Sequence, residues 1–157
     1  MKKALFKGSV LAFLLFFPSL FWAQAQESKT IKLNEPNKKR GLPIMEALSV
    51  RASVREWSDK DLSLQDLSDL LWAANGINRP ESKKRTAASA QNAQPELKYG
   101  WGAIDTGLVS QNRALFCAGT GLATRPRAAI SKDRIKELLK LKETQHPFLN
   151  HPVGYPK

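Results

Sequence analysis

The residues best suited to chemistry form the stretch Arg51-Ala52-Ser53-Val54-Arg55. Two guanidinium groups and one hydroxyl recur at every second residue. In an extended segment all three side chains would point to one face, where they could hold a phosphate or another anion. The same alternation is also typical of a solvated strand edge. The spacing therefore predicts an anion site and leaves open a surface strand with no ligand.

Three other side chains have reactive groups. Cys117 is the only cysteine, so no disulfide can form within the chain. It follows Leu-Phe in an apolar helical context, which favours a buried thiol over a nucleophile. His146 and His151 lack the i, i+4 spacing of a helical metal site, and we interpret both as structural or surface residues. We expect no metal site and no catalytic side chain among them.

Two helices are predicted to flank the arginine stretch. Pro43 precedes a short amphipathic pattern, which indicates a helix that leads directly into the stretch. After it, Ser63 and Asp66 have the spacing of a capping box. Apolar residues then recur at helical intervals and predict a core helix from Leu64 to Asn75, ended by a left-handed Gly76.

Further along the chain, residues 78–94 are polar and include Lys83-Lys84-Arg85. Such a segment is expected as a surface loop and is a candidate site, although its charge is also explained by solvation alone. A second long helix is predicted over residues 102–120, with Gly121 as its C-cap. An extended segment over 122–130, a helix over 132–141 capped by Ser131, and a short strand over 152–155 complete the prediction.

The N-terminal 25 residues have the pattern of a secretory signal peptide: lysines, an apolar run and an Ala-Gln-Ala cleavage site. An uncleaved membrane anchor is the alternative. Cleavage after Ala25 would remove three lysines and leave +8 of the formal charge of +11. Residues 26–42 are polar and are expected to form a flexible lead-in. Residues 43–157 would then form one basic domain that is attracted to anionic ligands.

Several consecutive motifs resemble those of the nitroreductase family, and their order and spacing together are specific. The closest likeness is to an exported branch in Bacteroides-like bacteria, related to the SagB-type dehydrogenases. The resemblance covers most of residues 42–157 and is carried by Met45-Glu46-Ala47-Leu48, Arg51-Ala52-Ser53-Val54-Arg55-Glu56-Trp57, Leu70-Leu71-Trp72-Ala73-Ala74-Asn75-Gly76, Arg85-Thr86-Ala87-Ala88-Ser89, Gly121-Leu122-Ala123-Thr124 and Val153-Gly154-Tyr155-Pro156.

The resemblance implies an α+β fold with a central, mostly antiparallel sheet flanked by helices, assembled as an intertwined homodimer. It implies FMN at the dimer interface and transfer of a hydride from NAD(P)H through the flavin to a small electron acceptor such as a nitroaromatic or a quinone. The cofactor supplies the chemistry, so no protein acid or base is obligatory. An exported, periplasmic enzyme is expected, with no nucleic-acid partner and no membrane span after cleavage.

The resemblance also implies roles for six residues. Arg51 and Ser53 would hold the FMN phosphate, and Arg55 would reach the pyrimidine edge of the isoalloxazine ring. A second motif falls on Ser89, Asn92 and Gln94, with Asn92 expected to hydrogen-bond the ring.

The sequence departs from the family pattern after Gln94. Between Gln94 and Trp101, where the family has a long segment with central strands, only Pro95 to Gly100 are present. An internally shortened domain is therefore expected. Two alternatives to the enzyme stay open: an exported basic binding module for anionic ligands, and a non-catalytic remnant without a ligand.

Overall fold

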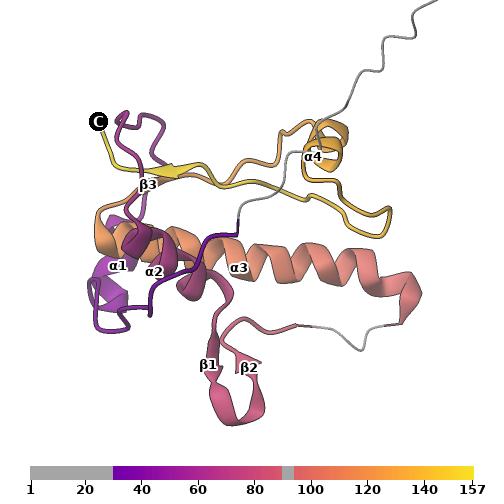
Figure 1. The fold of residues 1–157 in the computed structure, drawn as a ribbon, viewed down its shortest axis with the longest axis horizontal. Helices are drawn as coiled ribbons and strands as arrows, with labels where there is room; N and C mark the ends of the chain where they lie inside the picture. Colours follow the sequence, from indigo (N-terminus) through magenta and orange to yellow (C-terminus); the bar gives the residue numbers. More distant parts are fainter. Residues whose placement is uncertain (1–29, 90–93) are drawn as a thin grey trace, which may run out of the picture. The chain divides into compact units, whose positions relative to one another are not determined.

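Helix α3 (Lys98–Thr120) is the element against which the other helices of the core pack (Figure 1). Both α1 (Ile44–Val50) and α2 (Leu64–Asn75) lie against it. The structure is a computed structural model that describes residues 30–89 and 94–157, so the predicted signal peptide lies outside the described residues. Within the described part of the chain, no helix is long and apolar enough to cross a membrane.

The core is small and joins three segments. Leu70 of α2, Cys117 of α3 and Leu122 are buried together, with Phe116 and Tyr155 among the partly buried side chains around them. Helix α3 begins four residues earlier than the sequence predicts. Its end at Thr120 and its left-handed cap at Gly121, with φ of 74°, confirm the predicted C-terminus.

Helix α1 approaches α3 through small residues. Ala47 is buried, and a side chain at Gly119 would lie 3.6 Å from the Ala47 Cβ and 3.3 Å from the Leu42 backbone nitrogen. Only this small-residue face of α1 is covered. The large apolar side chains of Ile44 and Met45 are 58% and 73% exposed.

The predicted bounds of α2 are confirmed, because its N-terminus is fixed by a local cap. The Ser63 hydroxyl accepts a hydrogen bond from the Asp66 backbone nitrogen at 3.0 Å and donates one to the Asp66 carboxylate at 2.7 Å. The predicted left-handed stop is wrong: Gly76 has φ of −69°. Glycine is needed there for close approach, since a Cβ would lie 2.3 Å from Trp72 Cδ1.

The polar segment before α1 contacts α2. Asn37 donates from its backbone nitrogen to Asp69 Oδ1 at 2.7 Å. The Arg40 guanidinium lies 2.5 Å from an Asp66 carboxylate oxygen and 3.1 Å from one of Asp69. Asp69 is only 2% exposed. The expected lead-in over residues 26–42 therefore includes a stretch that is hydrogen-bonded to the core.

A β-hairpin occupies the start of the segment expected to be a loop. Strand β1 (Ile77–Arg79) continues through a 3₁₀ turn η1 (Pro80–Ser82) into the antiparallel strand β2 (Lys84–Arg85). In Figure 1 this hairpin extends away from α1 and α2. Lys83, in the turn, has a left-handed backbone with φ of 53°.

The central sheet expected from the resemblance is not formed by the described residues. They contain two separate two-stranded antiparallel sheets: β1 with β2, and β3 (Ala123–Thr124) with β4 (Val153–Gly154). The physical reason for this correction lies after Gln94. There the chain passes directly into the 3₁₀ helix η2 (Pro95–Leu97) and then α3, with no strand between them.

Helix α4 (Lys132–Leu138) is shorter than the predicted 132–141. Its expected N-cap, Ser131, makes no side-chain capping hydrogen bond. The chain turns at Lys140, whose φ of 50° is incompatible with a continuing helix.

Candidate functional site

The arginine stretch is extended, and the chain from Val54 to Ser58 is hydrogen-bonded to the second sheet. The Val54 backbone nitrogen donates to the Thr124 carbonyl of β3 at 3.0 Å. The Ser58 backbone nitrogen donates to the Tyr155 carbonyl at 2.9 Å, just after β4. The end of the stretch therefore lies beside the sheet in which β3 and β4 pair with each other.

The two-residue alternation predicted for this stretch is present in part. Val50, Ala52 and Val54 line an apolar cavity together with Cys117 and other residues of α3 and β3. Ser53 and Arg55 instead line a different, open cavity. Ser53 and Arg55 are exposed, but Val50 and Ala52 are exposed as well, and Val54 lines both cavities, so the two faces are only partly separated.

The open cavity has a volume of about 360 Å³ and is lined by Ser53, Val54, Arg55, Glu56, Pro156 and Lys157. We call it the Arg55 pocket. Arg55 and Lys157 supply two positive charges and Ser53 a hydroxyl donor, which suits a phosphate-sized anion. Glu56 offsets part of this charge. Lys157 was not found from the sequence, because only the pairing of the C-terminal segment brings it here.

Arg51 is placed differently from Ser53 and Arg55. It is the C-cap residue of α1, is half-buried, and is not among the residues that line the Arg55 pocket. Of the three side chains expected to act together, the structure brings two into one cavity.

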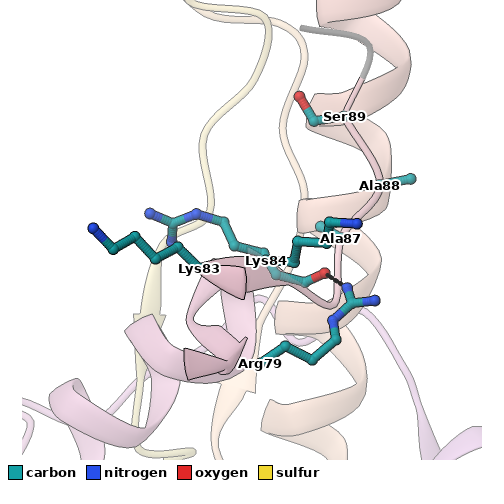
Figure 2. A pocket seen from close by; sticks show the side chains of 7 residues that line it. Arg79, Lys83, Lys84, Ala87, Ala88 and Ser89 are labelled. Carbon is teal, nitrogen blue, oxygen red and sulfur yellow. Dashed lines mark hydrogen bonds between the residues drawn. The ribbon is translucent and has the colours of Figure 1, made fainter. Parts of the chain in front are cut away.

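Ser89 lies in a second cavity, at the hairpin. This cavity has a volume of about 440 Å³, and we call it the hairpin pocket. Figure 2 shows Arg79 reaching across the hairpin to donate to the Arg85 carbonyl. The pocket is lined by Arg79, Lys83, Lys84, Arg85, Ala87, Ala88 and Ser89.

The hairpin pocket is strongly basic. Arg85 donates to the Asn75 carbonyl, so both arginines are bonded to backbone oxygens rather than to carboxylates. Within the described ranges, no carboxylate lies within ion-pair distance of these two arginines or of Lys83 and Lys84. The pocket therefore concentrates positive charge that a bound anion could neutralise.

The other two expected site residues are not at either pocket. Gln94 is exposed and is the N-cap residue of η2, where its carbonyl accepts a hydrogen bond from the Leu97 nitrogen at 2.9 Å. Asn92 lies outside the described residues. In a single chain, Ser53 and Arg55 are together, and Ser89 is in the other pocket.

Burial makes Cys117, the only cysteine of the sequence, unreactive. Cys117 has no exposed surface, and desolvation raises the pKa of its thiol to about 12, against an opposing effect of the Arg113 charge. The prediction of a buried, unreactive thiol is confirmed. No cluster of three or more potential metal ligands occurs among residues 30–89 and 94–157.

The sequence predicts a structural or surface role for His151, and the structure gives it two polar contacts. Its Nε2 lies 2.6 Å from the Ser110 hydroxyl of α3, and its Nδ1 lies 3.3 Å from the Thr124 hydroxyl of β3. Burial, and then the positive charge of Arg113, lower the pKa of the imidazole. No local pattern in the sequence could have found this arrangement, because its three residues are far apart along the chain.

The fold is similar to solved structures of nitroreductases. A protein from Ralstonia eutropha JMP134 assigned as a nitroreductase matches with a TM-score of 0.74 at 24% identity, over 80% of this chain and 88% of that one. The chain has a nitroreductase-like α+β fold. A nitroreductase family protein from Clostridium difficile 630 matches this nitroreductase-like fold with a TM-score of 0.54 at 19% identity, over 73% of this chain and 85% of the other.

A third similar structure comes from Parabacteroides distasonis ATCC 8503 and is assigned as an NADH dehydrogenase or NAD(P)H nitroreductase. It has a TM-score of 0.54 at 18% identity, over 72% of this chain and 86% of the other. No family model matches the sequence, and no curated protein matches it. At these identities the likeness establishes the fold, and the activity has to be argued from the site.

Proposed function

We propose that the protein is an FMN-dependent oxidoreductase of the nitroreductase type, which passes a hydride from NAD(P)H through the flavin to a nitroaromatic or quinone-like acceptor. The observation that carries this proposal is the Arg55 pocket within a nitroreductase-like fold. Bound FMN would supply the hydride chemistry. The protein would bind the cofactor, orient it and adjust its charge.

The donors of the Arg55 pocket fit the phosphate end of FMN. The Ser53 hydroxyl and the Arg55 and Lys157 cations can each donate to phosphate oxygens. In this arrangement Lys157 would join Ser53 on the phosphate, and Arg55 would bind either the phosphate or the ring. Arg51, half-buried beside them, would add positive charge without entering the pocket.

The flavin ring would need a second copy of the chain. Ser89, expected to act with Asn92 and Gln94 at the ring, lines the hairpin pocket and not the Arg55 pocket. The exposed apolar side chains of α1, Ile44 and Met45, are suited to contact between copies. We propose an intertwined homodimer in which Ser53 and Arg55 of one protomer face Ser89 of its partner across the flavin.

The first experiment is a visible-light spectrum of the purified protein, followed by FMN titration monitored by flavin fluorescence. Arg55→Ala should weaken FMN binding at least tenfold, because a charge-assisted donor to the phosphate is lost. Arg134→Ala, on the exposed face of α4, removes the same charge elsewhere and should leave binding unchanged. Colourless protein that does not bind added FMN would refute the flavoprotein proposal.

A mixing experiment tests the shared site. The variants Arg55→Ala and Ser89→Ala each damage both sites of a homodimer, but a heterodimer formed from the two holds one intact site. Unfolding and refolding them together should therefore restore part of the FMN binding. If the mixture binds no more FMN than the separate variants, the two residues act within one chain or not at all.

Export and shortening belong to the same proposal. Cleavage after Ala25 would deliver the protein to the periplasm, as in the exported SagB-related branch, and the direct passage from Gln94 into η2 is what an internally shortened member would show. Mass spectrometry of the protein purified from a periplasmic extract should give an N-terminus at Gln26. An N-terminus at Met1 in the membrane fraction would indicate an anchor instead.

The hairpin pocket supports a second candidate function, an exported basic module that binds anionic ligands without catalysis. Its four cations have no carboxylate partner among the described residues. This function predicts retention on heparin that falls steeply with salt and falls further in the double variant Lys83→Ala/Lys84→Ala. Retention on heparin that does not change with ionic strength would refute this second function.

A further inference from the structure

Ser110, His151 and Thr124 form a line of polar contacts, and none of the three lines either anion pocket. Ser110 comes from the interior of α3, Thr124 from β3, and His151 from the segment just before β4. The Ser110 hydroxyl lies 2.6 Å from His151 Nε2, and the Thr124 hydroxyl lies 3.3 Å from His151 Nδ1. All three residues are at least partly buried.

The hydrogen bonds define which ring nitrogen carries the proton. Thr124 donates its hydroxyl hydrogen to the Pro152 carbonyl at 2.8 Å, so toward His151 its oxygen can only accept. Both contacts of the ring are satisfied when His151 Nδ1 carries the hydrogen and Nε2 presents a lone pair to Ser110, and activation of Ser110 requires this tautomer. The Ser110 hydroxyl therefore donates to an imidazole that is free to take its proton.

The Ser110 hydroxyl borders a cavity. Ser110 and His151 line a pocket of about 230 Å³ whose other walls come from Asp105, Thr106, Val109, Arg113 and Leu149. Arg113 places a cation in that wall. A nucleophile, a base held by a third group, a nearby cation and a cavity for a small acyl group are the parts that covalent acyl transfer requires.

We propose that Ser110 is a nucleophile activated by His151, and that it accepts an acyl or phosphonyl group from a small activated ester. The Ser110 oxygen attacks the acyl carbon and its proton passes to His151 Nε2. The bond to the leaving group breaks, and the leaving oxygen or solvent takes the proton from the imidazolium. The products are an ester on Ser110 and the released alcohol or phenol. This proposal does not depend on flavin.

The position of Ser110 in α3 limits the second half of such a reaction. Backbone N–H groups in the interior of a helix are bonded within the helix, so they cannot form an oxyanion hole. Among the described residues that line the pocket, Arg113 is the one cation that could face the charge developing on the oxygen, and the wall also holds the Asp105 carboxylate. Hydrolysis of the Ser110 ester requires a second attack without that hole, so we expect the acylated protein to accumulate rather than turn over.

The test uses a fluorophosphonate probe on the purified protein at pH 7.5. In this reaction the Ser110 oxygen bonds to phosphorus, fluoride leaves, and the proton goes through His151 to solvent. Peptide mass spectrometry should locate the probe on Ser110. With p-nitrophenyl acetate, release of p-nitrophenol should stop after a burst of about one equivalent per chain, because the ester persists.

Variants test whether the Ser110 hydroxyl reacts because His151 activates it or reacts without that help. Ser110→Ala should abolish labelling, and His151→Gln should slow it about a hundredfold or more, which is the usual contribution of a general base. The control Ser49→Ala removes a hydroxyl that donates to the Glu46 carbonyl on α1, and it should label like the unchanged protein.

Two results would overturn the proposal. One is a probe located on other residues by mass spectrometry of the unchanged protein, a measurement that does not require any variant to fold. The other is equal labelling rates in the unchanged protein and in His151→Gln with matching circular dichroism, since Ser110 would then react without a base.

Discussion

The contacts of Arg40 give the prediction whose size can be worked out most directly from the structure. Its guanidinium lies 2.5 Å from Asp66 and 3.1 Å from Asp69, and its side chain is 26% exposed. Breaking a buried ion pair by removing one partner costs about 3–5 kcal/mol. Water reaches part of Arg40, and Asp69 keeps its bonds from the Asn37 nitrogen and from Gln65. We therefore expect Arg40→Ala to lower the free energy of unfolding by about 2 kcal/mol.

The assay is urea unfolding followed by circular dichroism, with Lys39→Ala as the matched control. Lys39 is the exposed neighbour of Arg40 and carries the same charge. A loss of about 2 kcal/mol corresponds to a midpoint shift of roughly 1 M urea for a protein of this size. Lys39→Ala should shift the midpoint by less than about a quarter of that amount.

The effect of Arg40→Ala should also depend on pH. Burial raises the pKa of both Asp66 and Asp69, but hydrogen bonds, including those from Arg40, outweigh it and hold both pKa values below the ordinary range. Carboxylates with a lowered pKa in the folded state stabilise it above their unfolded pKa of about 4 and lose that contribution as the pH falls. The difference in free energy of unfolding between Arg40→Ala and Lys39→Ala should therefore shrink below pH 4.

Two outcomes would refute the reasoning about Arg40. One is a loss equal to that of Lys39→Ala at pH 7, which would mean that the ion pairs add nothing. The other is a loss that persists undiminished at pH 3, which would mean that Arg40 acts through packing and not through the carboxylates.

Three further predictions concern single residues. Gly76→Ala should lower the free energy of unfolding by about 2 kcal/mol or more, because its Cβ would meet Trp72 at 2.3 Å. Gly121→Ala should lower the free energy of unfolding by only about 1 kcal/mol: its φ of +74° strains an alanine, but nothing lies within 4 Å of the new Cβ. Thermal unfolding of both variants tests this, and a larger loss in Gly121→Ala than in Gly76→Ala would contradict it. Cys117 should not react with a thiol reagent at pH 8 until urea unfolds the protein, since its pKa is about 12, and reaction at the unfolded rate in native buffer would disprove its burial.

The features that the sequence predicted correctly are those with local causes. The bounds of α2 follow from a cap and a helical repeat within one segment, and the end of α3 follows from Gly121. The shared cavity of Ser53 and Arg55 follows from the two-residue period of an extended backbone. Each of these needs no information from elsewhere in the chain.

The features that the sequence missed depend mainly on neighbours outside the local pattern. The sequence predicts a left-handed stop at Gly76, whereas glycine is required there because the Trp72 ring leaves no room for a Cβ. The predicted central sheet rested on the resemblance, and the chain between Gln94 and α3 holds no strand that could build it. The hairpin at Ile77–Arg85 has no turn dipeptide that signals it, because Lys83 takes the left-handed conformation that glycine or asparagine usually adopts.

The Arg55 pocket and the Ser110–His151 pair both depend on one distant segment, residues 150–157. Lys157 completes the Arg55 pocket, and His151 makes the base contact with Ser110. Between them, Tyr155 accepts the Ser58 backbone hydrogen bond through its carbonyl and donates its hydroxyl to Asp66. Pairing of β4 with β3 therefore positions an anion pocket and a serine–histidine pair in one step. The local pattern indicates Ser53 and Arg55, but no local pattern could add Lys157 to them or bring His151 to Ser110, because these partners are far apart along the chain.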